Sequence, residues 1–128
     1  MRHLKAGRKL GRSATHRRAM LRNMVTSLII NGSVRTTDAK AKELRRVADR
    51  MVTLGKERTL AARRRARRFI RTDTALKMLF DEVAPLFADR PGGFTRVVKL
   101  GGNRRGDSAS MSLVEFTETV GSAKADNG

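Results

Sequence analysis

The sequence predicts a compact α/β domain of the α+β type, with about four helices and a small three-stranded sheet that includes a C-terminal β-hairpin. Three observations support this prediction. Apolar residues recur at helical spacing in several segments before residue 88, whereas β-branched and aromatic runs separated by a glycine-rich stretch follow Gly92. The length of 128 residues is that of one domain.

The first segment of the chain is strongly basic. Residues 1–12 combine five cations and two glycines with no periodic apolar face, so we expect a basic arm that is disordered when alone in water. An organelle transit peptide is the alternative, but Gly7 and Gly11 interrupt any amphipathic helix there, and we favour a retained arm. We therefore expect an arm over residues 1–12, one globular domain over residues 13–118 and a flexible tail over residues 119–128.

A first helix is expected to begin after Ser13 or Thr15, because either side chain is a suitable N-cap. It should end at Asn31 and Gly32, a pair suited to a left-handed helix end. Its apolar stripe consists of Leu21, Met24, Val25, Leu28 and Ile29. A short strand over residues 33–36, with Val34 as its apolar residue, follows.

A second helix is expected after Thr37, which is positioned to cap it. Asp38 lies in its first turn, where the helix dipole favours an anion, and Gly55 is expected to end the helix. Its core face consists of Ala41, Leu44, Val47, Ala48, Met51 and Val52.

A third helix is expected over residues 59–71, and a fourth opens at Thr72 or Asp73 and ends or kinks at Pro85. The fourth helix carries Leu76, Leu79, Phe80 and Val83, and its apolar surface continues into Leu86 and Phe87. Residues 94–100 and 111–117 are expected to form a hairpin around the long loop GGNRRGDSAS.

The charge of the chain is large and unevenly distributed. Lys and Arg number 29 against 12 Asp and Glu, which gives a net charge of +17. Residues 1–72 carry a balance of +18 and the remainder a balance of −1. This surplus predicts a polyanionic partner that meets the first part of the chain. No apolar run approaches the ~18 residues that span a bilayer, so we expect no membrane partner.

The third helix contains the sharpest pattern of charge, TLAARRRARRFIR. On an ideal helix, one side carries Arg64, Arg67, Arg68 and Arg71, and the other carries Ala62, Ala66, Phe69 and Ile70. Like charges at this spacing repel, and the sequence offers no acid that we expect to relieve them. A solvated charged face normally mixes signs, so we favour phosphate binding, which suits the planar fork of arginine.

The first helix shows a similar conflict between its charges and its dipole. Arg17 and Arg18 lie near its N-terminus, where the dipole disfavours cations, and Arg22 follows one turn later. A backbone phosphate at this end would resolve the conflict. An inconsequential surface position remains the alternative for any single one of these arginines.

Enzymatic chemistry is not indicated. The chain has no Cys, and His3 and His16 have no companions at metal-ligand or catalytic spacing. The glycine pairs match neither the dinucleotide fingerprint nor the phosphate loop, so we expect no metal, no cofactor and no small-molecule substrate. The five Phe residues mostly belong to core stripes, which disfavours base stacking and favours folded RNA over single strands. A nucleoid-type DNA-binding protein and an RNA-acting enzyme are the rival interpretations.

The residues also resemble a known family. MRHLKAGRKLGR, THRRAMLRNMVTSLI, TTDAKAKELRRVAD, LFDEVAPLFADRPGGFTRVVKL and RRGDSASMSLVE are similar, in this order, to the L-seventeen family of bacterial large-subunit ribosomal proteins. The resemblance covers residues 1–118. It implies a compact α/β fold and binding to 23S ribosomal RNA near the nascent-chain exit, and we therefore expect a non-catalytic role in translation. It also implies neighbouring ribosomal proteins such as L-thirty-two. The basic arm, which has no apolar segment for secretion, leads us to expect a cytoplasmic location.

The expected RNA-binding residues come from two sources. By motif position, the resemblance implies RNA contacts for Arg2, His3, Lys5, Arg8, Lys9, Arg12, His16, Arg17, Arg18, Arg22, Lys40 and Lys42. The charge pattern itself adds Arg64, Arg67, Arg68 and Arg71, together with Arg104 and Arg105 of the hairpin loop. For these last two, the alternative role is to keep an exposed loop soluble.

Overall fold

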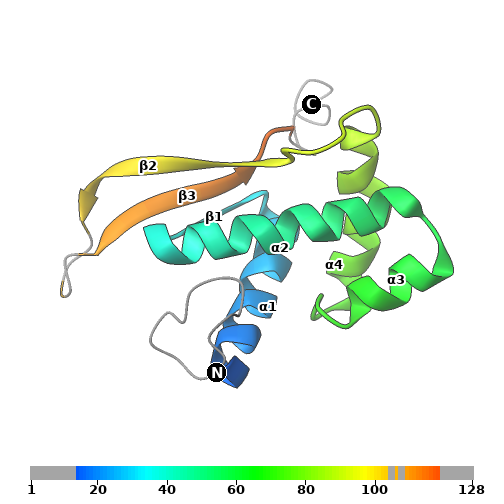
Figure 1. The fold of residues 1–128 in the computed structure, drawn as a ribbon, viewed down its shortest axis with the longest axis horizontal. Coiled ribbons are helices and arrows are strands. Elements are labelled where there is room, and N and C mark those ends of the chain that lie inside the picture. Colours follow the sequence, from blue (N-terminus) through cyan, green and yellow to red (C-terminus); the bar gives the residue numbers. More distant parts are fainter. Residues whose placement is uncertain (1–13, 104–105, 107–108, 119–128) are drawn as a thin grey trace, which may run out of the picture.

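The computed structural model describes residues 14–103, 106 and 109–118. Within these residues four α-helices, two shorter helical turns and three strands follow in the order α1, β1, α2, α3, α4, η1, η2, β2, β3. The helices gather on one side of the sheet, and α2 runs along it (Figure 1). The α+β class is confirmed. The expected arm over residues 1–12 and tail over residues 119–128 lie outside the described residues.

Helix α1 spans Ala14–Asn31, so Thr15 lies inside its first turn rather than at its cap. The predicted apolar stripe is confirmed, because Leu21, Val25, Leu28 and Ile29 are buried and Met24 packs partly buried against the core. Gly32 has φ +85 and ends the helix as predicted, since this left-handed conformation favours glycine.

The sheet is antiparallel, with β3 (Ser110–Phe116) between β1 (Ser33–Thr37) and β2 (Thr95–Asn103). Val34, Val114 and Val97 stand opposite one another across the three strands. Strand β2 continues three residues beyond the predicted end at Leu100, with a register shift between Lys99 and Asn103. The hairpin is confirmed, and it projects beyond the N-terminal end of α2 (Figure 1).

Helix α2 spans Asp38–Glu57 and begins after Thr37 as predicted. The Thr37 side chain makes no capping hydrogen bond, and Asp38 instead accepts one from the Ser112 hydroxyl at 2.5 Å. The predicted core face is confirmed, with Val47 partly buried and the following residues fully buried: Ala41, Leu44, Ala48, Met51 and Val52.

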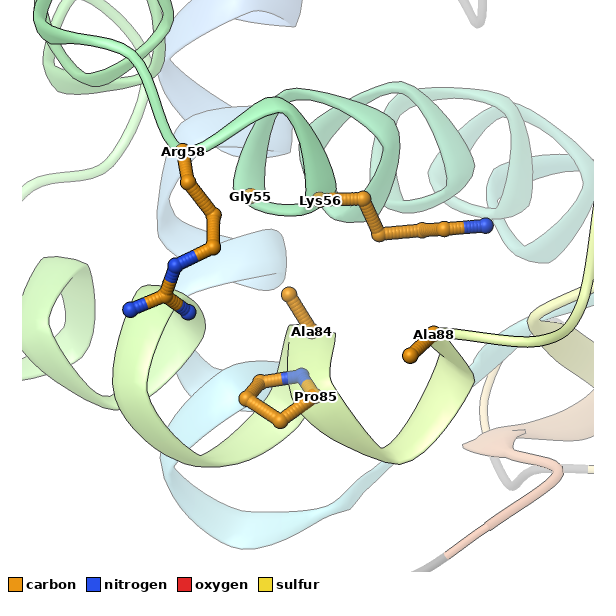
Figure 2. Close-up of a pocket in the computed structure, with 6 residues that line it drawn as sticks. All are labelled: Gly55, Lys56, Arg58, Ala84, Pro85 and Ala88. Carbon is orange, nitrogen blue, oxygen red and sulfur yellow. The ribbon is translucent and has the colours of Figure 1, made fainter.

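The prediction that Gly55 ends α2 is wrong. The helix continues to Glu57, and Arg58 takes the left-handed conformation that ends it, with φ 56. Gly55 is buried, and a Cβ atom at this position would lie 2.7 Å from the Cβ of Ala84. Figure 2 shows Ala84 directly beneath this turn of α2. The glycine is therefore needed for a close approach between two helical segments rather than for a helix end.

Helix α3 spans Leu60–Arg67, and the Thr59 hydroxyl caps it by accepting from the Ala62 amide at 3.0 Å. The prediction that this helix reaches residue 71 is wrong. After Arg67 the amides of Phe69 and Ile70 both bond to the Ala66 carbonyl, and the chain turns. This turn buries Ile70 in the core.

Helix α4 spans Asp73–Met78 and is capped by Thr72, whose hydroxyl accepts from the Ala75 amide at 3.1 Å. It continues as a π-helical turn, η1 (Leu79–Val83), and a 3-10 turn, η2 (Ala84–Phe87), with Pro85 in the first positions of η2. The prediction that the helix runs to Pro85 and ends or kinks there is wrong in its position, because the α-helical form already ends at Met78 and the helical course continues through Pro85 to Phe87. Proline is tolerated in the first positions of η2, where its missing N–H leaves no hydrogen bond unmade. Leu76, Leu79, Phe80, Val83 and Phe87 are buried, whereas Leu86 is 38% exposed and does not continue the apolar surface.

The start of β2 is fixed to the helices by aromatic and polar contacts. The Phe87 ring lies 5.1 Å from that of Phe94, between ring centroids, and Phe94 is itself buried just before the strand. Asp49 of α2 accepts hydrogen bonds from the Thr95 hydroxyl, at 3.1 Å, and from the backbone of Phe94 and Thr95. Burial raises the pKa of the Asp49 carboxyl above its ordinary 3.8, although these hydrogen bonds and the charge of Arg45 act in the opposite direction.

The contact at Gly55 generates a first prediction. Gly55→Val should destabilise the domain by about 1–3 kcal/mol, because the added atoms overlap Ala84 and the two segments must separate. Urea unfolding followed by circular dichroism measures the change. Gly92→Ala is the control, since a Cβ at Gly92 meets open space and should change stability by less than about 0.5 kcal/mol. Equal stability of the two variants would contradict this account of Gly55.

The environment of Asp49 generates a second prediction. A raised pKa in the folded state means that the folded chain binds this proton more tightly than the unfolded chain does. The resulting stability is present below the unfolded pKa and is lost as pH rises through the folded pKa. Asp49→Asn keeps an oxygen for Thr95 but cannot ionise. The stability of the variant relative to the original chain should therefore be greater at about pH 7 than at about pH 3. Urea unfolding of both proteins at both pH values measures this difference. A relative stability of the variant that is smaller at about pH 7 than at about pH 3 would contradict the account.

Candidate RNA interface

Five exposed arginines lie on α1, α3 and the connection from α3 to α4. We call them the arginine surface: Arg18, Arg64, Arg67, Arg68 and Arg71. Four of them were predicted to line one face of a single helix. Only Arg64 and Arg67 belong to α3, whereas Arg68 and Arg71 lie in the connection that follows it. All five side chains are exposed, and because they lie on three segments, contacts between those segments rather than helical periodicity set their arrangement.

Three contacts hold α1 against this connection. The Arg22 Nε atom donates to the Phe69 carbonyl at 3.2 Å. The Thr26 hydroxyl donates to the Arg22 carbonyl at 2.7 Å and accepts from the Arg71 amide at 3.0 Å. The Arg18 guanidinium lies 5.7 Å from the centre of the Phe69 ring. Two basic segments that the sequence predicted separately therefore form one surface.

The expectation that no acid relieves the third helix is wrong. The Arg67 guanidinium pairs with the Asp73 carboxylate, and Arg65 lies 4.0 Å from the carboxylate of Glu57. All four side chains are more than 40% exposed, so each pair contributes little to stability, about 0–1 kcal/mol. Among the described residues, no carboxylate pairs with Arg64, Arg68 or Arg71.

The predicted residues of α1 fall into two groups. His16 and Arg18 are exposed and Arg17 is partly exposed, all near the N-terminal end of the helix. The first turn of α1 contains no acidic residue. Arg22 is half-buried, and its Nε atom is bonded to Phe69, so this residue has a structural role between α1 and the connection.

A second group of cations lies beside a groove of about 600 Å³ between α2 and β2. The groove is lined by Lys42, Arg45, Arg46, Asp49, Gly93, Val97 and Lys99. Only Lys42 of this group was predicted from the sequence, together with Lys40, which is partly buried. Arg45 and Arg46 were not predicted, although they stand three and four residues after Lys42, the same spacing that marked the third helix.

The remaining predicted residues lie outside the described part of the chain: Arg2, His3, Lys5, Arg8, Lys9, Arg12, Arg104 and Arg105. In the described part of the chain no group of three or more His, Cys, Asp or Glu side chains is placed to hold a metal ion. A search of the same residues finds no helix that is both long and apolar enough to cross a membrane.

Comparison with known proteins identifies the family. A model of the ribosomal protein L17 family matches residues 20–117. Three similar proteins are each named large ribosomal subunit protein bL17. That of Syntrophotalea carbinolica is 54% identical over 92% of this chain and 76% of its own length. That of Nitratidesulfovibrio vulgaris is 49% identical over 98% of this chain and 94% of its own length. That of Pelobacter propionicus is 51% identical over 98% of both chains.

Proteins of this family are structural components of the ribosome rather than enzymes. The agreement extends over most of the chain, with about half of the residues identical. The chain therefore belongs to the ribosomal protein L17 family.

Proposed function

We propose that this chain is a non-catalytic constituent of the large ribosomal subunit in the cytoplasm, where it binds 23S ribosomal RNA. The arginine surface would neutralise backbone phosphates and so allow segments of the RNA to pack closely. The basic residues of the segment over 1–12 and the hairpin residues Arg104 and Arg105 would add further contacts. Neighbouring ribosomal proteins, L-thirty-two among them, would complete its surroundings.

The observation that carries this proposal is the concentration of exposed arginines with few acids to balance them. Arg64, Arg68 and Arg71 have no carboxylate partner within the described residues, and their mutual repulsion favours a bound polyanion. Arginine suits phosphate because its planar fork can donate two parallel hydrogen bonds. The described residues thus present these cations on folded, packed elements.

The aromatic residues support recognition of the backbone rather than of bases. Four of the five Phe residues are buried in the core. The fifth, Phe69, is partly buried beneath Arg18 and packs against the core. A protein that stacks single-stranded bases needs exposed aromatic faces, which these residues do not supply. Folded RNA, recognised through its phosphates and shape, fits this surface better.

Removal of charge from the arginine surface tests the proposal. The variant Arg64→Gln/Arg68→Gln/Arg71→Gln should weaken binding to transcribed 23S ribosomal RNA. If about eight phosphates are neutralised by the original chain, its log–log slope of affinity against KCl concentration should be of order −6. Loss of three contacts should reduce the magnitude of that slope by about 2. Filter binding at several KCl concentrations gives both slopes.

A matched control removes three cations from the rest of the chain, in the variant Lys77→Gln/Arg90→Gln/Arg96→Gln. These side chains are exposed, and the ion pairs of Arg90 and Arg96 contribute little to stability. The control should keep the slope of the original chain. Equal slopes for the two triple variants would contradict the role of the arginine surface. Equally tight binding of duplex DNA would favour a nucleoid-type protein instead.

A further inference from the structure

The groove between α2 and β2 has the composition of a second phosphate site. Cations stand on both of its walls, with Lys42, Arg45 and Arg46 on α2 and Lys99 on β2. These four side chains are all exposed. Among the described residues, no carboxylate forms an ion pair with Lys42, Arg46 or Lys99.

The one carboxylate of the groove is already occupied by contacts within the protein. Asp49 is partly buried and accepts hydrogen bonds from the Thr95 hydroxyl and from the backbone at the start of β2. Arg45 is attracted to it electrostatically. Asp49 therefore fixes the two walls of the groove relative to each other, and the surplus of cations over this single acid remains available to a ligand.

The charges and the lining of the groove favour a strand of nucleic acid over a peptide. Lys42 and Arg46 are one helical turn apart, about 6 Å along α2, so each can meet a different phosphate of one strand. Val97 is the one large apolar side chain that lines the groove, and a docked acidic peptide would have little to bury there. A segment of RNA backbone is therefore the occupant that the charges and the lining fit best.

The groove and the arginine surface lie on different parts of the molecule. The arginine surface belongs to α1, α3 and the connection after α3, which lie on the other side of α2 from β2 in Figure 1. Along α2 alone, Arg46 is about 17 Å from Glu57, after which α3 begins. A segment of RNA in the groove would therefore be separated by α2 from RNA at the arginine surface.

We propose that this groove is a second RNA-backbone site and that the chain joins two separate RNA segments, one at each surface. This inference rests on the proposed function, because it assumes that the arginine surface binds RNA. The groove holds its segment through Lys42, Arg45, Arg46 and Lys99, while α2 acts as the rigid spacer between the two sites.

Energy transfer between two RNA molecules tests the inference. The full chain is mixed with an excess of one short RNA hairpin, half of it carrying a donor dye and half an acceptor. The original chain should hold two hairpins at once and produce energy transfer. The groove variant Lys42→Gln/Arg45→Gln/Arg46→Gln should still bind one hairpin but bind the second more weakly by on the order of tenfold or more, since three phosphate contacts are lost.

Two further variants separate the groove from general loss of charge. Lys77→Gln/Arg90→Gln/Arg96→Gln removes the same number of cations elsewhere and should keep energy transfer. Lys42→Arg/Arg45→Lys/Arg46→Lys keeps the groove cationic and should restore most of it. Thermal unfolding of each variant checks that the fold is intact.

The outcomes distinguish the two proposals. Energy transfer by the groove variant equal to that of the original chain would overturn the second site. Binding of a single hairpin by the original chain, without energy transfer, would overturn the second site but leave the proposed function standing. Failure to bind any RNA would overturn both. Loss of affinity for a polyglutamate peptide in the groove variant, with RNA bridging unchanged, would assign the groove to an acidic protein partner instead.

Discussion

Helix α2 packs against α1, α3, all three strands and both short helical turns, so its apolar face is shared by nearly every element of the domain. Ala41, Leu44 and Val52 on this face are fully buried. On the flank of α2 that lines the groove with β2, Lys42, Arg45 and Arg46 remain exposed. The same 3.6-residue period therefore builds the core and aligns a row of cations. Both the core and the cations of the groove therefore depend on the placement of this single helix.

Elements specified by local signals were predictable from the sequence. The apolar stripe and terminal glycine of α1 needed no distant residue, and the strands of the hairpin were marked by composition and by a glycine-rich loop. The errors in the ends of α2 and α3 have a tertiary cause. Gly55 resembled a helix end, but its role depends on Ala84, which is 29 positions away in the sequence. The third helix stops early because burial of Ile70 and the bond from the Arg71 amide to Thr26 favour a turn.

In the candidate site, too, local features were predictable from the sequence and tertiary features were not. The spacing of the arginines within residues 64–71 predicted that they lie on a face away from the apolar side chains, and they are exposed. Their predicted arrangement on one helix is wrong, because α3 ends at Arg67. The pairing of Arg67 with Asp73 was missed because the turn that brings them together was not foreseen. The groove was missed for a related reason. Lys99 joins the α2 cations only through packing of β2, although the spacing of Lys42, Arg45 and Arg46 was already visible in the sequence.

The central claim is that the surplus of cations holds this chain on the ribosomal RNA of the large subunit. Sedimentation of a cell lysate through a salt-washed sucrose gradient, with mass spectrometry of every fraction, tests it most directly. We expect this chain in the fractions of the large subunit, with release only as salt competes for the phosphates. Recovery at the top of the gradient or with DNA would contradict the claim. Recovery with the small subunit would keep an RNA-binding role but reject its place in the large subunit.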